Sequence, residues 1–270
     1  MKTSEISKQL GSSLEARMLV KHITDLTDAD IIASDTITLS QDQQRWLEKA
    51  IQRRLDGCPI SKIIGFKEFY GRDFIVSVDV LDPRPDSEIL IDVVLDYAAG
   101  MEDLKILDLG TGSGCLILTL LSEIADATGI ATDISDKALG VAEANAKKLD
   151  IDDRLTFIQS DWLESIEGQF DIIVSNPPYI ESNLIPNLNK TVSNYDPIQA
   201  LDGGQDGLYP YKMILPQIRN YLKKGGLMVL EHSYDQQERI KRLVEQAGLE
   251  RIQGHQDLGA LDRIVSAIHK

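Results

Sequence analysis

The chain has few of the residues on which metal, disulfide and membrane chemistry depend. Its 270 residues include two cysteines, Cys58 and Cys115, and four histidines, all in separate segments. Neither set has the spacing of a disulfide framework, a zinc site or a catalytic triad, so we expect no metal and assign the histidines surface or packing roles. No apolar run approaches the roughly 20 residues that a membrane-spanning helix needs. The first residues form a polar helical pattern rather than an apolar signal core. We therefore expect a cytoplasmic protein.

Positive charge is also scarce. The chain has 28 Lys and Arg residues against 43 Asp and Glu residues, which gives a formal net charge of -15. Proteins that bind nucleic acid through its phosphates gain much of their affinity from Lys and Arg side chains, which displace counterions. No Lys/Arg-rich run is evident, so nucleic acid is not an expected partner.

Residues 1–65 are predicted to form a small helical domain, and residues 66–82 a β-hairpin connector. Apolar residues recur at four-residue spacing near the start of the chain, at Ile6, Leu10, Leu14 and Met18. Ser40 and Gln43 fit a capping box, and the helix that they begin should end before Gly57. From residue 74 the apolar period becomes two, which predicts a strand over residues 74–81.

Residues 83–270 alternate between helices and strands. We expect strands near 105–109, 129–132, 155–158, 170–175 and 227–230, separated or followed by helices near 86–100, 116–124, 137–149, 209–222 and 236–247. Such alternation predicts a parallel sheet covered by helices on both faces. Two late strands, near 251–255 and 263–268, leave no room for a helix between them and should be antiparallel. This α/β architecture resembles the Rossmann-like methyltransferase fold, in which the last strand runs against the others.

A glycine-rich turn follows the predicted strand at 105–109. Its glycines permit positive φ and a close approach of the backbone to a ligand, and the next helix begins with free N–H groups. Asp133 ends the next strand, where a carboxylate can accept hydrogen bonds from ribose hydroxyls. The third glycine comes one residue sooner than in dinucleotide enzymes, and an acid before the turn is atypical of them. A tight turn without a ligand is the alternative. The candidate cofactor residues here are Asp108, Gly110, Thr111, Gly112, Ser113, Gly114 and Asp133.

The turn resembles the D-x-G-x-G-x-G sequence of S-adenosylmethionine enzymes. That resemblance implies that Asp108 lies near the cationic amino group at the methionine end of the cofactor. Asp161 and Trp162 follow the strand near 155–158, where an acid and an aromatic residue commonly flank the adenine in this fold. A surface Asp and a core Trp are the alternative.

The sequence Asn176-Pro177-Pro178-Tyr179 directly follows the predicted strand at 170–175, so it lies at the strand edge where ligands of open α/β sheets bind. An Asn-Pro pair alone is a turn signal, and a turn without chemistry is the alternative. An amide or aniline-like nitrogen is a poor nucleophile because its lone pair is delocalised. The Asn176 side-chain oxygen and the Pro177 carbonyl could accept both of its N–H bonds, direct its lone pair to a sulfonium methyl and stabilise the developing positive charge.

The prolines stiffen this loop, and Tyr179 could pack against the flat target group. We therefore assign Asn176, Pro177 and Tyr179 to catalysis and all four residues to substrate binding. Asn176 should also border the cofactor.

With these residues assembled, the chain resembles the release factor glutamine methyltransferases of the PrmC/HemK family over nearly its whole length. The resemblance is carried by residues 59–65, by Pro83-Arg84-Pro85-Asp86-Ser87-Glu88, by Asn176–Tyr179 and by residues 200–208. It implies a class I S-adenosylmethionine-dependent methyltransferase domain and an N-terminal helical domain that docks a class I peptide chain release factor. The glutamine of a Gly-Gly-Gln loop would be the substrate, S-adenosylhomocysteine the product, and the chain a monomer.

Arg84 and Glu88 are assigned to the wall of the site on this resemblance, although without it they could form a buried ion pair at a domain junction. Asp82 stands where the family usually has an aliphatic residue, and Glu231-His232-Ser233-Tyr234 replaces a stretch that more often has glycine after the acid. We expect neither departure to touch the chemistry, but Asp82 leaves the local packing open.

Three other functions compete with this interpretation. A DNA adenine N6-methyltransferase meets the same chemical problem at Asn176, but must extract its base from a duplex and contact phosphates, which the charge of -15 disfavours. A nicotinamide oxidoreductase is disfavoured by the glycine spacing and by the Asn-Pro-Pro-Tyr sequence. A non-catalytic module that holds a release factor is disfavoured by the intact Asn176 and glycine turn.

Overall fold

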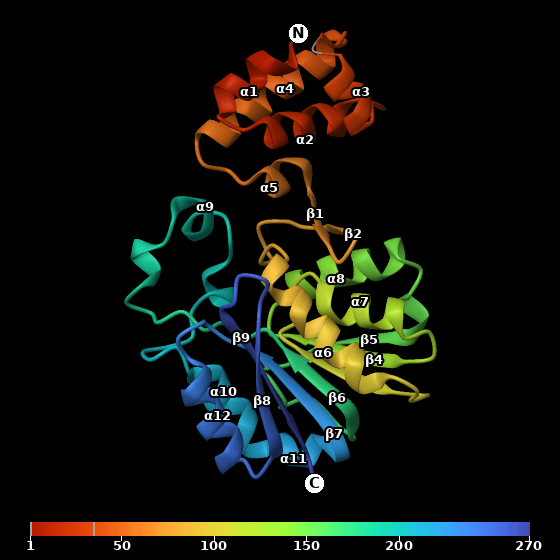
Figure 1. Ribbon diagram of the computed structural model, residues 1–270, viewed down its shortest axis with the longest axis vertical. Coiled ribbons are helices and arrows are strands. Elements are labelled where there is room, and N and C mark those ends of the chain that lie inside the picture. Colours follow the sequence, from red (N-terminus) through yellow and green to blue (C-terminus); the bar gives the residue numbers. More distant parts are fainter. Residues whose placement is uncertain (1, 35) are drawn as a thin grey trace. The chain divides into compact units, whose positions relative to one another are not determined.

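The computed structural model describes residues 2–34 and 36–270. The chain folds into two compact units (Figure 1). The first comprises Met1–Phe66 and Asn189–Tyr195, and the second comprises Lys67–Leu188 and Asp196–Lys270. The inclusion of Asn189–Tyr195 in the first unit has no counterpart in the sequence-based prediction, because that segment carries no signal separating it from its neighbours.

The first unit is helical, as predicted. Its helices are α1 (Thr3–Leu10), α2 (Ser13–Ile23), α3 (Asp28–Ala33), α4 (Gln41–Leu55), α5 (Ile60–Ile64) and the short α9 (Lys190–Ser193). The capping box at the start of α4 is present, because the side chain of Ser40 accepts from Gln43 N–H while the side chain of Gln43 accepts from Ser40 N–H. Leu19 and Leu47 are fully buried in the core, and Tyr195 packs against it.

The second unit begins at Lys67, within the two-stranded sheet of β1 (Phe66–Phe69) and β2 (Arg72–Ile75). The strand predicted over residues 74–81 is wrong beyond Ile75. Asp79 N–H donates to Ser77 Oγ at 3.1 Å, which folds the chain into a local turn. Val78, which the period of two places on the same face as Phe74 and Val76, is 63% exposed, whereas those two residues are buried.

A seven-stranded sheet forms the centre of the second unit, in the order β5-β4-β3-β6-β7-β9-β8. The strands are β3 (Lys105–Leu109), β4 (Thr128–Asp133), β5 (Leu155–Gln159), β6 (Phe170–Ser175), β7 (Leu222–Glu231), β8 (Glu250–Gln256) and β9 (Asp262–Ile268). The first five strands of that order are parallel, and β9 is antiparallel to both of its neighbours. The mixed sheet with a reversed last strand is therefore confirmed.

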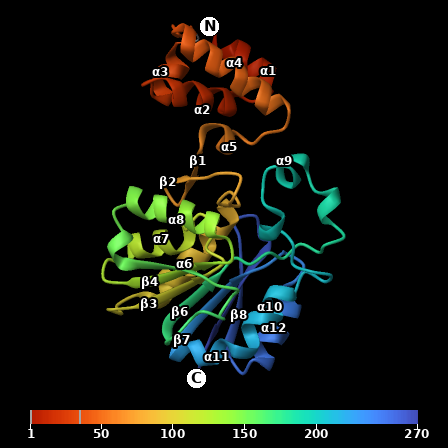
Figure 2. The same cartoon turned by 180° about the vertical axis from the view of Figure 1, so that it is seen from behind.

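Helices cover both faces of this sheet (Figures 1 and 2). The helices α6 (Glu88–Ala98), α7 (Cys115–Glu123) and α8 (Asp136–Lys148) bury one apolar cluster. On the opposite face, α10 (Tyr209–Ile214), α11 (Ile218–Tyr221) and α12 (Gln237–Gln246) bury a second. Strand residues alternate between the clusters: Ile106 contributes to the first and Leu107 to the second.

The helix predicted over residues 209–222 is divided. Between α10 and α11 lies a 3₁₀ turn, Leu215–Gln217, which contains Pro216. Proline lacks an N–H and interrupts the regular hydrogen bonding of a helix. Other 3₁₀ turns are Pro85–Ser87, Asp152–Arg154, Ile185–Asn187 and Ile198–Ala200. Within the described part of the chain, every helix is too short or too polar to cross a membrane.

Candidate cofactor and substrate site

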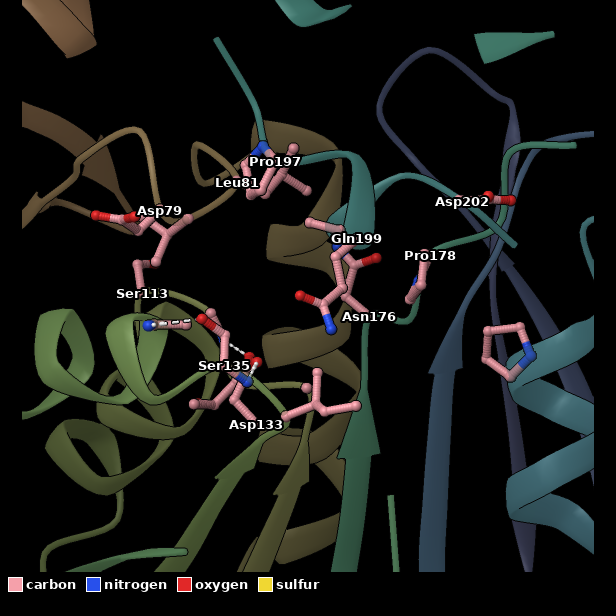
Figure 3. Close-up of a pocket in the computed structure, with 18 of the residues that line it drawn as sticks. Asp79, Leu81, Ser113, Asp133, Ser135, Asn176, Pro178, Pro197, Gln199 and Asp202 are labelled. Carbon is pink, nitrogen blue, oxygen red and sulfur yellow. Dashed lines mark hydrogen bonds between the residues drawn. The ribbon is translucent and has the colours of Figure 1, made fainter. Parts of the chain in front are cut away.

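A cavity of about 780 Å³ opens in the second unit, where β3, β4 and β6 end. This volume lies in the range of small-molecule sites, and the location is the edge at which open α/β sheets bind ligands. Figure 3 shows Ser113, Asp133 and Ser135 on one side of the cavity and Asn176, Pro178 and Gln199 on the other. The structure thus brings most of the predicted site residues to one cavity: Arg84, Gly110, Thr111, Gly112, Ser113, Asp133, Asp161, Trp162, Asn176 and Pro178.

The glycine turn has the left-handed backbone that its sequence predicts. Gly110, Gly112 and Gly114 have φ values of 72°, 56° and 80°. A Cβ at Gly112 would meet nothing within 4 Å, so the backbone conformation rather than space favours glycine there. A Cβ at Gly114 would lie 2.9 Å from Leu118 Cδ1, so this glycine permits close packing on α7 instead of lining the cavity.

Asp108 lies beneath this turn and is fully buried. One carboxylate oxygen, Oδ2, accepts from Thr111 Oγ1 at 2.6 Å, while Oδ1 has no donor among the described residues. Burial raises the pKa of Asp108 to about 7. The hydrogen bond from Thr111 opposes that rise, the negative charge of Asp133 adds to it, and the backbone N–H of Ile117 also opposes it. A buried carboxylate with a free oxygen is energetically costly without a cationic or hydrogen-bonding partner.

Asp133 fixes the turn from the neighbouring strand. Its Oδ2 accepts from Gly112 N–H at 3.0 Å, and its Oδ1 accepts from Ser135 N–H at 2.9 Å. Burial raises the pKa of Asp133, and these backbone hydrogen bonds oppose the rise. Farther along the wall, Trp162 has a left-handed backbone with φ of 50°. Its ring lies near Gly110, since a Cβ there would be 3.7 Å from Trp162 Cζ3.

These residues fit S-adenosylmethionine. The free Asp108 Oδ1 suits the cationic amino group of the cofactor, the glycine turn provides a wall without side chains, and Asp133 and Trp162 offer a carboxylate and an indole at the cavity surface. Among the described residues, no group of three or more His, Cys, Asp or Glu side chains is arranged to hold a metal ion.

The Asn-Pro-Pro-Tyr loop begins where β6 ends. Asn176 and Pro178 line the cavity, whereas the Pro177 side chain is buried and Tyr179 packs into the core beside α10 and α12. Burial raises the pKa of Tyr179, and the negative charge of Glu231 adds to the rise. Neither the Asn176 side-chain oxygen nor the Pro177 carbonyl accepts a hydrogen bond from residues 2–34 or 36–270.

Residues 201–207 brace this loop from behind. Ile180 N–H donates to Leu201 O at 3.0 Å, and Gly203 N–H donates to Ile180 O at 2.8 Å. The two backbones approach so closely that a Cβ at Gly203 would lie 2.8 Å from Tyr179 Cα and 2.9 Å from Pro178 O. This contact explains in physical terms why a glycine-rich segment accompanies the Asn-Pro-Pro-Tyr loop.

Arg84 and Glu88 do not form an ion pair with each other. Arg84 lines the cavity, and its Nη2 lies 3.1 Å from Asp196 Oδ2. Glu88 is absent from the cavity wall of the described residues, and its Oε1 instead accepts from Tyr70 N–H at 2.9 Å. The structure thus gives Glu88 a role in holding the hairpin. Asp82, whose packing the sequence left open, is buried and lines the cavity.

The sequence-based prediction missed several residues that support the site. Asn145 of α8 is fully buried and joins β2 to the glycine turn. Its Oδ1 accepts from Ile75 N–H, and its Nδ2 donates to Ile75 O and, at 2.9 Å, to Ser113 O. Gln236 Nε2 donates to Tyr179 O at 3.0 Å. These residues are polar positions within or beside apolar patterns, which is a weak signal because exposed polar residues look the same in a sequence.

Glu231 belongs to the stretch that was expected not to touch the chemistry, and it is absent from the cavity wall of the described residues. The residue is 1% exposed, and the side chains of Ser87 and Asn176 lower the pKa of its carboxylate. Glu231 ends β7, so an acid at the carboxyl end of a buried strand was the available signal.

Comparison with known proteins agrees with the fold. A family model described as a methyltransferase domain matches residues 101–263, and one described as the PrmC N-terminal domain matches residues 5–65. Among solved structures, the hMettl16 catalytic domain in complex with a 3′UTR hairpin has a TM-score of 0.61 at 14% identity, covering 94% of this chain and 89% of that one. A methyltransferase from Pyrococcus furiosus has a TM-score of 0.53 at 16% identity, covering 82% and 98%. Fold and site together define a class I S-adenosylmethionine-dependent methyltransferase.

Sequence relatives narrow that class. The release factor glutamine methyltransferase of Agrobacterium fabrum is 38% identical over 257 residues, which covers 94% of this chain and 89% of the relative. That of Rhodospirillum rubrum is 38% identical over 253 residues, covering 94% and 78%. A bifunctional methyltransferase of Rickettsia bellii is 40% identical, covering 93% of this chain and 50% of that one. This chain belongs to the release factor glutamine methyltransferase family.

Proposed function

We propose that this protein transfers the methyl group of S-adenosylmethionine to the side-chain amide nitrogen of the glutamine in the Gly-Gly-Gln motif of class I peptide chain release factors. S-Adenosylhomocysteine is the second product. The observation that carries the proposal is the pair of free acceptors, Asn176 Oδ1 and the Pro177 carbonyl, at the carboxyl end of β6 beside the cavity.

Two acceptors suit a primary amide because that group has two N–H bonds. Hydrogen bonds to Asn176 Oδ1 and Pro177 O would hold the amide nitrogen in one orientation and turn its lone pair toward the methyl donor. The same oxygens would stabilise the positive charge that develops on nitrogen as the N–C bond forms and the C–S bond breaks. The methylated nitrogen is cationic, which makes its N–H protons acidic. One of them then passes to water, so the step needs no strong base at the amide.

Cofactor binding is assigned to the residues on the opposite wall. When bound, S-adenosylmethionine supplies the sulfonium methyl. Asp108 Oδ1 would accept from the amino group of its methionine portion, and Gly110–Gly112 would allow its close approach to the backbone. Asp133 would bond the ribose hydroxyls, while Asp161 and Trp162 would flank the adenine by a hydrogen bond and by ring contact.

The remaining parts of the proposal concern partners. The helical unit is assigned to docking of the release factor, and Arg84 to the wall beside the glutamine loop. We expect a cytoplasmic monomer without a metal. The rival substrate is adenine in DNA, whose exocyclic amine also has two N–H bonds, but the net charge of -15 opposes phosphate contacts.

A competition assay tests the substrate class. The protein would be incubated with S-adenosylmethionine labelled in its methyl group, an unmodified class I release factor and duplex DNA rich in adenine, at physiological salt. We expect label in the release factor and none in the DNA. Label in DNA alone would replace this proposal with the adenine methyltransferase, and calorimetric titration of S-adenosylmethionine serves as the control for a folded cofactor site.

A further inference from the structure

Glu231 and Asn176 occupy corresponding positions on two adjacent strands. In the parallel pairing of β6 with β7, Ser175 lies opposite Leu230. The next residues are Asn176, which directly follows β6, and Glu231, the last residue of β7, so both lie at the carboxyl edge of the sheet. Figure 1 shows β6 and β7 side by side in the sheet.

Ser87 lies beside this pair. Asn176 Nδ2 donates to Ser87 Oγ at 3.2 Å, and both side chains are close enough to the Glu231 carboxylate to lower its pKa. Ser87 is 2% exposed and Glu231 is 1% exposed, so both are almost completely buried. The second carboxylate oxygen of Glu231, Oε2, has no donor among the described residues.

The chemistry of a carboxylate determines which end of the Asn176 amide faces it. An ionised carboxylate only accepts hydrogen bonds, whereas an Asn side chain carries a donor nitrogen and an acceptor oxygen. The Nδ2 group of Asn176 must therefore face Glu231, which leaves Oδ1 for another donor. A carboxylate at Nδ2 also polarises the amide and strengthens Oδ1 as an acceptor, because linked hydrogen bonds reinforce one another.

We infer that Glu231 is a positioning residue that fixes the amide orientation of Asn176 so that Oδ1 is presented to the substrate amide. This inference rests on the proposed function, since it supplies the cause of the Asn176 orientation on which methyl transfer to an amide nitrogen depends. Ser87 supports the arrangement because its hydroxyl accepts from Asn176 Nδ2 and favours the ionised form of Glu231.

Charged and titratable groups on several elements face Glu231. The positive charge of Arg263 in β9 lowers the pKa of Glu231, and the negative charge of Asp86 in the 3₁₀ turn Pro85–Ser87 raises it. The negative charge of Glu231 in turn raises the pKa values of Tyr179, Tyr211 and Cys115. Burial raises the pKa of Glu231 to about 7, while the hydrogen bond from Ser87, the charge of Arg263 and the hydrogen bond from Asn176 oppose the rise. Since the ionised form orients Asn176, methyl transfer should increase as the pH rises through about 7.

The variant Glu231→Gln tests this inference at saturating S-adenosylmethionine. A Gln side chain offers Asn176 both a donor and an acceptor, so both amide orientations become available. We expect kcat for release-factor methylation to fall by about 10- to 100-fold, the range in which a misplaced reacting group reduces rate. The increase of kcat near pH 7 should disappear, while the S-adenosylmethionine Kd stays within about twofold of the wild-type value. Glu245→Gln, at an exposed position of α12, is the matched control and should behave as wild type.

A double-variant cycle separates positioning from a general structural effect. If Glu231 acts through Asn176, adding Glu231→Gln to Asn176→Ala should reduce kcat little further, because the group that it orients is already gone. Ser87→Ala gives an independent measurement if Glu231→Gln does not fold. Loss of its hydrogen bond should move the pH midpoint of kcat upward.

The inference is overturned if Glu231→Gln keeps the wild-type kcat and the wild-type pH dependence. It is also overturned if the reduction in kcat caused by Glu231→Gln adds fully to the reduction caused by Asn176→Ala, or if Ser87→Ala leaves the pH midpoint of kcat unchanged. Failure of the proposed function is a separate result, because the wild-type protein itself would then leave the release factor unmethylated.

Discussion

Asn176, Gly203 and Asp108 are the residues whose individual chemistry the site depends on most. Asn176 supplies a free acceptor, Gly203 lets a second backbone approach the loop that carries it, and Asp108 places a buried carboxylate under the cavity. The sequence reveals Asn176 and Asp108 because each belongs to a contiguous motif. It could not reveal Glu231, Ser87 or Asn145 in their roles, because each acts through a residue remote in the chain.

Substitution of Gly203 tests the close approach behind the loop. In Gly203→Ala the new Cβ would lie within 3 Å of three backbone atoms, so the Pro178–Tyr179 backbone must shift. We expect a loss of about 1–3 kcal/mol in unfolding free energy, as for overpacking elsewhere, together with reduced kcat. Chemical denaturation and methyl-transfer rates measure the two effects.

Gly140→Ala is the control, since its Cβ meets nothing within 4 Å on the exposed side of α8 and alanine favours a helix by about 1 kcal/mol. Wild-type stability and kcat in Gly203→Ala would contradict the bracing role.

Cofactor affinity should depend on pH through Asp108. Its pKa in the folded protein is raised from 3.8 to about 7, so ionisation disfavours the folded state. The stability that this group contributes is full below pH 3.8 and is lost as the pH rises through about 7. A bound amino group would favour the ionised form, so the affinity for S-adenosylmethionine should increase about tenfold between pH 6 and pH 8.

Calorimetric titration at several pH values would measure this change. Asp108→Asn should bind more weakly and show no such increase. Wild-type affinity that is independent of pH over this range would contradict the assignment of Asp108 to the amino group.

At the scale of elements, the parallel strands and their connections position the site, and most of them follow from the sequence. Alternating apolar patterns and glycine or proline boundaries locate β3 to β9 within one or two residues in most cases, with β7 beginning earlier than predicted. The strand over residues 74–81 failed because an apolar period of two does not distinguish a continuous strand from a strand end followed by a turn. Phe74 lies in β2, whereas Val76 and Val80 pack together beyond the end of that strand. Pairing partners decide that question, and they are not local.

Asn145 links two of these elements, and its replacement tests that link. Asn145→Ala leaves the N–H and carbonyl of Ile75 without their partner, as well as the carbonyl of Ser113. Unsatisfied buried groups cost about 1–3 kcal/mol each, so we expect a clear loss of thermal stability. Affinity for S-adenosylmethionine should also fall, because Ser113 belongs to the cofactor wall.

Asn220→Ala, at an exposed position of α11, is the control for the loss of an amide and should match wild type. Unchanged cofactor affinity in Asn145→Ala would show that the link supports folding alone.

At the scale of the whole molecule, the proposed cofactor site and the proposed docking surface belong to different units of the chain. Every residue that lines the cavity belongs to the second unit. The first unit is a helical bundle with its own core, to which Asn189–Tyr195 also belongs.

A shortened protein of residues 67–270 tests this division of labour. Tyr195→Ser would be included, since Tyr195 loses its packing partners when the helical unit is removed. We expect S-adenosylmethionine to bind with nearly unchanged Kd, and KM for the release factor to rise by about tenfold or more as a second binding surface is lost. The full-length Tyr195→Ser variant is the control. An unchanged KM would contradict docking by the helical unit.

The central claim is that the nitrogen held by Asn176 is that of one particular glutamine. The most direct measurement is mass spectrometry of the Gly-Gly-Gln peptide from an unmodified class I release factor, after incubation with this protein and S-adenosylmethionine. The account predicts one added methyl group, located on the glutamine side chain, and its loss in Asn176→Ala. An unmodified glutamine in the presence of confirmed cofactor binding, or a methyl group at any other atom, would contradict it.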